Sequence, residues 1–163
     1  MKRYIRSDIT TILQEDFVTR GRLAESSSTT PRLLARLAKD PKNVIRVKVA
    51  LNPNTPATTL EELAQDPEDC VRSYVVCNPN VSLDLLHNMI SDPYYRVREQ
   101  IAKNPNIDSD TLENLSTDDS PLVREAVADN PNTPISYIEW YAKNDPHPDV
   151  RKAAKIHLRE LRS

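Results

Sequence analysis

Five arginines recur along the chain at a spacing that could place anion chemistry on one surface. They are Arg46, Arg72, Arg98, Arg124 and Arg151, which follow one another every 26 residues, except that the last step is one residue longer. A guanidinium presents a planar fork of N–H donors that suits carboxylates and phosphates. Six residues before each arginine stands an aspartate: Asp40, Asp66, Asp92, Asp118 and Asp145. We expect a structural ladder in which each arginine pairs with an aspartate of its own or an adjacent segment, with contact to an external anion as a second role.

A second marker follows the same period. Asparagine precedes proline every 26 residues, at Asn52, Asn78, Asn104 and Asn130. Self-similarity at a fixed period of about 20–50 residues is the signature of a solenoid of stacked repeats. We expect these asparagines to bond turn backbones between coils rather than to contact a ligand.

Proline punctuation divides each repeat into two short helices. Thr55-Pro56 predicts a helix start, with threonine as the N-cap and proline at the first helical position. Asp66-Pro67 ends that helix and offers the second helix the same kind of start. Asn78-Pro79 ends the second helix, because the residue before proline is pushed out of the α region. Leucines at helical spacing give the first helix an apolar stripe, and valines do the same for the second.

These elements predict an all-α fold, an α-solenoid of about six 26-residue two-helix repeats. Residues 1–27 form a degenerate N-terminal repeat, residues 28–149 the regular repeats and residues 150–163 a C-terminal capping helix, all within a single repeat domain. Helices this short are marginal alone in water, so stacking on neighbouring repeats must stabilise them.

The repeat resembles a known family, the leucine-rich repeat variant (LRV). The resemblance is carried by Leu63-Ala64-x-Asp66-Pro67, followed by Val71-Arg72-x-x-Val75-Val76-x-Asn78-Pro79-Asn80, and by the corresponding string from Val123 to Pro134. It implies a right-handed superhelix of alternating α- and 3₁₀-helices. A founding type of this family carries a cysteine-rich iron–sulfur segment at its N-terminus. The resemblance does not imply such a segment here, because residues 1–69 contain no cysteine. The spacing from aspartate to arginine is also similar to the ladder of HEAT repeats.

Positions that change from repeat to repeat are the candidates for partner binding. A lone tryptophan stands in an otherwise polar first-helix column, and tryptophan is enriched at binding hot spots. The candidates are Trp140, Tyr74, Tyr94, Tyr95 and Arg36. Two alternatives are packing of the tryptophan against the C-terminal helix and a local cluster of the two turn tyrosines.

Composition argues against catalysis and cofactors. The chain has one glycine, Gly21, so it lacks the glycine-rich loops that hold phosphates and dinucleotides. Cys70, Cys77 and three histidines show no metal-ligand spacing, and no nucleophile motif is present. We expect no enzyme, cofactor or metal site.

Charge is distributed unevenly along the chain. Residues 1–53 carry 11 Lys/Arg against 5 Asp/Glu, residues 54–150 carry 6 against 18, and residues 151–163 carry 5 against 1. An acidic middle would repel a nucleic-acid strand, which needs a continuous basic face. We therefore favour a module that binds another protein, with nucleic-acid binding through the basic ends as the alternative. With no apolar leader or membrane span, we expect a cytoplasmic protein without membrane contact.

Overall fold

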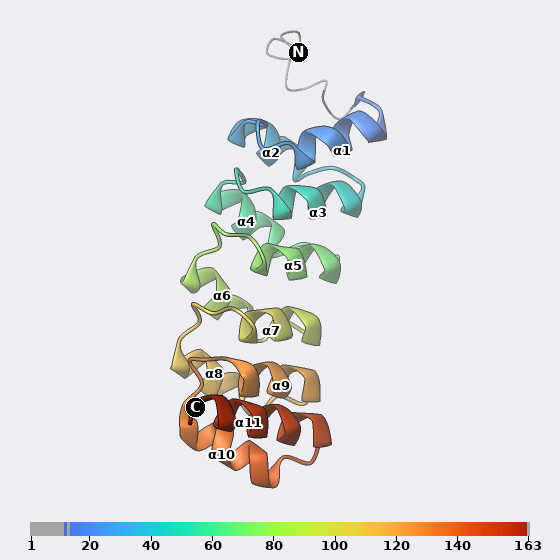
Figure 1. Ribbon diagram of the computed structural model, residues 1–163. Coiled ribbons are helices and arrows are strands. Elements are labelled where there is room, and N and C mark those ends of the chain that lie inside the picture. Colours follow the sequence, from blue (N-terminus) through green and yellow to red (C-terminus); the bar gives the residue numbers. More distant parts are fainter. Residues whose placement is uncertain (1–11, 13, 163) are drawn as a thin grey trace. The chain divides into compact units, whose positions relative to one another are not determined.

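The computed structural model describes residue 12 and residues 14–162, and these residues form helices and no strands (Figure 1). The chain divides into two compact units, Met1–Ser82 and Leu83–Ser163. Within each unit, two-helix repeats stack in chain order, so the predicted all-α solenoid is confirmed. Of the degenerate repeat predicted for residues 1–27, residues 1–11 and 13 lie outside the described residues, and the rest contains one helix, Phe17–Glu25. The single repeat domain stays a prediction.

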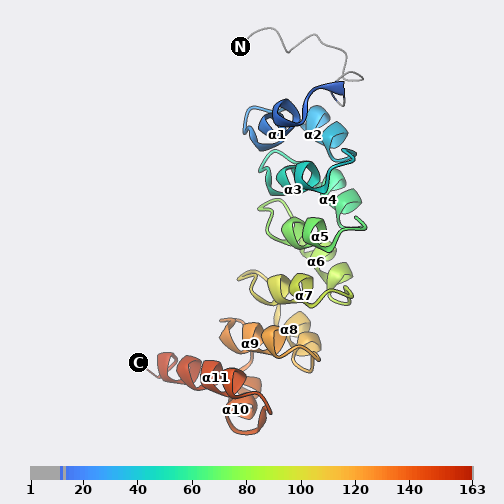
Figure 2. The same ribbon diagram turned by 90° about the vertical axis from the view of Figure 1, so that its right-hand side faces the viewer.

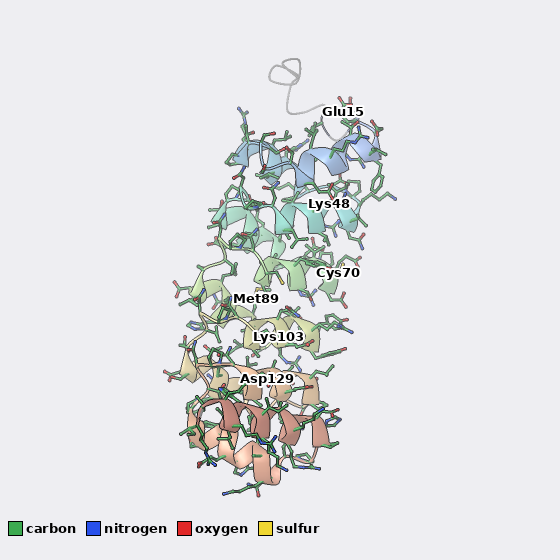
Figure 3. All side chains as sticks on the ribbon, viewed as in Figure 1. Glu15, Lys48, Cys70, Met89, Lys103 and Asp129 are labelled. Atoms are coloured by element: carbon green, nitrogen blue, oxygen red, sulfur yellow. The ribbon has the colours of Figure 1, made fainter. Side chains whose placement is uncertain are left out.

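Unit one holds α1 (Phe17–Glu25), α2 (Pro31–Leu37), α3 (Asn43–Leu51), α4 (Ala57–Leu63) and α5 (Asp69–Val76). The odd-numbered helices pack against one another in one layer, α1 on α3 and α3 on α5. Helices α2 and α4 lie beside that layer, as the two views in Figures 1 and 2 show. Charged side chains add contacts between successive repeats: Nζ of Lys48 on α3, labelled in Figure 3, lies 2.9 Å from Oε1 of Glu25 on α1.

Unit two repeats the plan with three helix pairs. It holds α6 (Leu83–Met89), α7 (Tyr95–Ala102), α8 (Ser109–Leu115), α9 (Pro121–Asp129), α10 (Ile135–Asn144) and α11 (Pro148–Glu160). Helix α7 packs on α9 and α9 on α11, and α10 lies against α11. Both helices of every pair are α-helical, which differs from the alternation with 3₁₀-helices that the family resemblance implies.

Apolar pairs from both helices form the core of each repeat. First helices bury Leu34/Leu37, Leu60/Leu63, Leu86/Met89, Leu112/Leu115 and Ile138/Tyr141. Second helices bury Ile45/Val49, Val71/Val75, Val97/Ile101 and Val123/Val127. These are the stripes that helical spacing predicts. Because most of the helices have only seven to ten residues, burial between neighbours supplies their stability.

The predicted threonine cap is wrong. Helix α4 begins at Ala57, with Pro56 as the N-cap and no side-chain capping bond. The hydroxyl of Thr55 instead donates to the carbonyl oxygen of Val49 in α3, at 2.6 Å. The last carbonyls of a helix have no partner within it, so this donor satisfies the helix that ends rather than the one that begins.

The predicted start of the second helix is also displaced. Helix α5 begins at Asp69 rather than directly after Asp66. The carboxylate of Asp66 accepts the N–H of Glu68 at 3.0 Å and thereby closes the turn that leads into the helix. This local side-chain bond to the backbone two residues on competes with a helical start at proline.

Asparagine amides join successive repeats. Each Nδ2 group donates to two backbone carbonyls near the end of the preceding second helix: Asn52 to Ala24 and Ser26, Asn78 to Ala50 and Asn52, and Asn130 to Ala102 and Asn104. All three amides are buried. Their Oδ1 atoms accept the N–H two residues on, so one side chain satisfies three backbone groups.

A histidine takes this position in the last repeat. His157 follows Asn130 by one residue more than the asparagine spacing, and it is buried. Its Nδ1 lies 2.7 Å from the carbonyl oxygen of Ala128 in α9, so Nδ1 is the donor. Asp129, at the end of the same helix (Figure 3), has a pKa raised by burial and lowered in part by His157.

We expect Asn130→Ala to lower the free energy of unfolding by about 1–3 kcal/mol, because the carbonyls of Ala102 and Asn104 lose their donor in a buried site. Urea denaturation followed by circular dichroism measures this change. The matched control is Asn88→Ala, which truncates an exposed asparagine on α6. Equal stability of the two variants would contradict the role given to the amide.

Candidate functional site

Within each unit, arginines of the ladder join one repeat to the next. Nε and Nη2 of Arg98 donate to the two carboxylate oxygens of Asp118, at 2.6 and 2.9 Å. Arg124 holds Asp145 in the same way, at 2.8 and 3.1 Å. Arg46 does so with Asp66 in unit one, at 2.6 and 2.8 Å. The sequence allows each arginine to pair with an aspartate of its own repeat or of an adjacent repeat, and these three contacts are to the adjacent repeat.

The other edge of each guanidinium binds its own repeat. Nη1 donates to the backbone carbonyl of the aspartate six residues earlier, at distances from 2.6 to 2.9 Å: Arg46 to Asp40, Arg72 to Asp66, Arg98 to Asp92, Arg124 to Asp118 and Arg151 to Asp145. The aspartate carboxylates also accept the N–H two residues on. Each aspartate therefore shapes its own turn.

Arg20 is a further member of the ladder that the predicted set omits. Its Nε lies 2.6 Å from Oδ2 of Asp40, whose side chain is fully buried. The signal was present in the sequence, since Arg20 precedes Arg46 by the same interval that separates Arg46 from Arg72. The valine or isoleucine that precedes the other ladder arginines is a threonine there, which hides the match.

Electrostatics at the ladder follow from these bonds. The hydrogen bond to Asp118 raises the pKa of Arg98. Burial acts to raise the pKa of the Asp118 carboxyl, but hydrogen bonds from Arg98 and from the Ser120 N–H outweigh it and hold the pKa below the usual value. Asp145 shows the same balance, with Arg124 supplying the main opposing hydrogen bond. Both partners stay charged at neutral pH.

Carboxylates therefore accept from three of the five arginines that sequence reasoning assigned to possible anion contact, namely Arg46, Arg98 and Arg124. The side chains of Arg46, Arg98 and Arg124 are only 12–17% exposed. An arginine–carboxylate pair with two hydrogen bonds and little exposure to solvent fixes the orientation of two repeats against each other. Contact between these arginines and an external anion stays a prediction.

The candidate partner-binding residues are not members of the ladder. Trp140, on α10, is 52% exposed, with its ring edge-on to Tyr141 at 5.9 Å between centroids. Tyr74, on α5, is 42% exposed. Arg36, on α2, is half-buried, and its Nε has no hydrogen-bond partner.

Tyr94 and Tyr95 form a small cluster of tilted rings at the start of α7. Their ring centroids lie 5.3 Å apart, and the Arg96 guanidinium covers the Tyr95 ring at 5.5 Å. Both tyrosines are half-buried. The local-cluster alternative thus has a geometric basis, and it leaves these two rings less available than Trp140.

One ion pair resembles part of a catalytic centre. His87 Nε2, on α6, lies 2.6 Å from Oδ2 of Asp108, which caps α8 by accepting the N–H of Thr111 at 2.8 Å. That backbone bond, together with His87, lowers the pKa of Asp108 to about 2. In the described part of the chain no hydroxyl or thiol hydrogen-bonds His87, so the pair lacks a nucleophile to activate.

Metal and membrane chemistry find no support in the described residues. No cluster of three His, Cys, Asp or Glu side chains suited to a metal ion occurs there. Cys70 and Cys77 are both reduced, outside any disulfide, and burial raises the pKa of Cys77. None of the described helices is long and apolar enough to cross a bilayer.

Known proteins share this repeat. Residues 44–68, which span most of α3 and all of α4, match the family model described as leucine rich repeat variant. A solved structure described as a leucine-rich repeat variant with a novel repetitive protein structural motif matches with a TM-score of 0.50 and 22% identity, over 91% of this chain and 71% of that chain. One repeat of the chain thus matches the leucine-rich repeat variant model, and the chain is similar in fold to that solved structure. No curated protein matches it in sequence.

Both ladders have members inside the matched segment. The matched segment contains Arg46, Asn52 and Asp66, which are one member of each recurring column. The same side-chain bonds recur in the repeats outside that segment, as Arg124 and Asn130 show. The hydrogen-bond geometry of the matched repeat is therefore common to other repeats of the described chain.

We expect Arg98→Ala to destabilise the chain by about 1–3 kcal/mol, because Asp118 is left buried without its charged partner. Thermal and urea unfolding measure the loss. Arg96→Ala removes an exposed arginine two residues away and is expected to change stability by no more than about 0.5 kcal/mol. Identical melting of Arg98→Ala and wild type would contradict a structural ladder.

Acid should weaken the ladder through its aspartates. The folded-state pKa of Asp118 lies below the unfolded value of about 3.9, so its stabilisation is fully present above that pH and is lost as pH falls through the folded pKa. The difference in melting temperature between wild type and Asp118→Asn should therefore shrink between about pH 6 and about pH 2. A constant difference across that range would show that the carboxylate is not the group that matters.

Proposed function

We propose that this repeat protein is a non-enzymatic interaction module, an adaptor that holds another protein on exposed residues that differ between repeats. The observation that carries the proposal is the separation of two kinds of position. Recurring arginines, aspartates and asparagines bond to the chain itself, whereas the variable column contains an exposed tryptophan.

The recurring side chains are not available to contact a ligand, because their donors already bond to the chain itself. A buried asparagine amide that donates to two carbonyls has no donor left for a ligand. A ladder arginine such as Arg98 uses both edges of its guanidinium within the chain. What a partner can contact is therefore the set of side chains that vary.

Exposure singles out Trp140 among those side chains. More than half of its surface is accessible, which is unusual for so large an aromatic group. The alternative in which the tryptophan packs beneath the C-terminal helix would leave it covered. Aromatic side chains at the centre of an interface supply a large share of binding energy, so Trp140 is the first residue to test.

The test compares tagged wild-type and Trp140→Ala chains in nuclease-treated and untreated halves of one lysate, read by quantitative mass spectrometry. We expect one protein to be retained by wild type and to fall at least about tenfold with Trp140→Ala, because truncating a hot-spot tryptophan costs about 2 kcal/mol or more. The control is Leu122→Ala, which removes a side chain 41% exposed on α9. Retention that disappears after nuclease treatment would overturn the proposal in favour of nucleic-acid binding.

A further inference from the structure

The last arginine of the ladder has only one of its two edges bound. Nη1 of Arg151 donates to the carbonyl oxygens of Asp145 and Pro146, at 2.6 and 2.9 Å. Arg124, the preceding arginine of the ladder, makes the equivalent Nη1 bond to a backbone carbonyl and also donates from Nε and Nη2 to the carboxylate of Asp145. Within residues 14–162, no Asp or Glu oxygen lies within 4.0 Å of the Arg151 side chain.

Arg151 is held in the orientation that the ladder uses for carboxylates. The two carbonyl bonds fix the guanidinium at the start of α11, and the side chain is half-buried. A fork whose rotamer is already set loses less entropy when a carboxylate binds. Arg46, Arg98 and Arg124 define the contact it would make, two N–H···O bonds of 2.6–3.1 Å.

Further cations on α11 extend the same face. At about 100° per residue, the cationic residues of this segment fall within an arc of about 100°. They are Arg151, Lys152, Lys155 and Arg159, which we call the α11 face. It lies opposite the buried stripe of Val150, Ala153, Ala154 and His157. None of the four forms an ion pair with a described residue, and all but Arg151 are exposed.

The chemistry of this face favours protein carboxylates over phosphates. Ile156, 44% exposed, borders the cations, and an apolar side chain on a partner can cover it whereas a phosphate backbone cannot. The helix is also only 13 residues long, about 20 Å, and residues 54–150 are strongly acidic, so a nucleic-acid strand leaving α11 would meet repulsion. An acidic helix of similar length fits the face without extending past it.

We propose that the α11 face binds an acidic segment of another protein, with one carboxylate held by the Nε–Nη2 fork of Arg151. This proposal rests on the proposed function, since it names the chemistry of the protein partner and a site for it away from Trp140. Lys155 and Arg159, one and two turns along the helix from Arg151, pair with carboxylates spaced four residues apart on the bound segment.

The probe is a fluorescent 15-residue helical peptide with glutamates four residues apart and leucines beside them, titrated by fluorescence anisotropy. A peptide with glutamine for every glutamate and a thymidine oligonucleotide of matching length are the comparison ligands. We expect wild type to bind the glutamate peptide at least about tenfold more tightly than either. Equal or tighter binding of the oligonucleotide or of the glutamine peptide would overturn the proposal.

Two variants test the fork itself. Arg151→Gln should weaken glutamate-peptide binding about tenfold, and Arg151→Lys should not restore it, because an ammonium keeps the charge without the planar fork. Arg151→Gln should lower the melting temperature less than Arg98→Ala does, since the carbonyls of Asp145 and Pro146 lose a donor but no described carboxylate loses a partner. Lys155→Gln with Arg159→Gln, both exposed, gives an independent reduction if a substitution at Arg151 unfolds the chain.

The outcomes separate this proposal from the one on which it rests. Unchanged peptide binding in the Arg151 variants and in the Lys155/Arg159 double variant would remove the α11 site, while the Trp140→Ala experiment would still decide the adaptor function. Self-association of the wild type that Arg151→Gln abolishes, seen by sedimentation, would replace the partner protein by a second copy of this chain and overturn the proposal.

Discussion

Helices of only two turns leave much of their backbone hydrogen bonding unsatisfied, and the rest of this structure depends on how those groups find partners. A helix of eight residues has four terminal carbonyls without an internal donor, half of its total. The asparagine amides and threonine hydroxyls supply donors to those carbonyls, and the arginine guanidiniums supply them to the carbonyls of the turns. The recurring polar columns are therefore as necessary to the fold as the leucines and valines of the core.

Much of this could be predicted from the sequence because period and chemistry agree. Leu60 and Val71 repeat with the proline punctuation, so the helices, their buried faces and the all-α class follow directly. Which aspartate each arginine pairs with could not be predicted, because the aspartate six residues before Arg98 and the one twenty residues after it follow the same period. In the structure Arg98 donates to the backbone carbonyl of the first and forms an ion pair with the carboxylate of the second.

Other features were beyond sequence reasoning for local reasons. Thr55 has the residue type of an N-cap, but its hydroxyl is drawn to the carbonyl of Val49 in the helix before it. His157 shares no residue type with the asparagine column, and only the one-residue shift in phase reveals that it takes the same position. The pairing of His87 with Asp108 depends on the distance between two neighbouring first helices, which no motif records.

Bonds between repeats recur at the same positions within each unit. A ladder arginine donates to the following repeat and an asparagine amide donates to the preceding one, so the repeats offer their neighbours the same donors and acceptors. A block of one repeat length, cut at equivalent points, can thus be duplicated or deleted in frame and still leave each donor with an acceptor. Recombination can therefore change the number of repeats without first creating an unpaired buried charge, while point mutations alter the exposed columns independently. Length and surface chemistry are free to evolve at separate rates in such a chain.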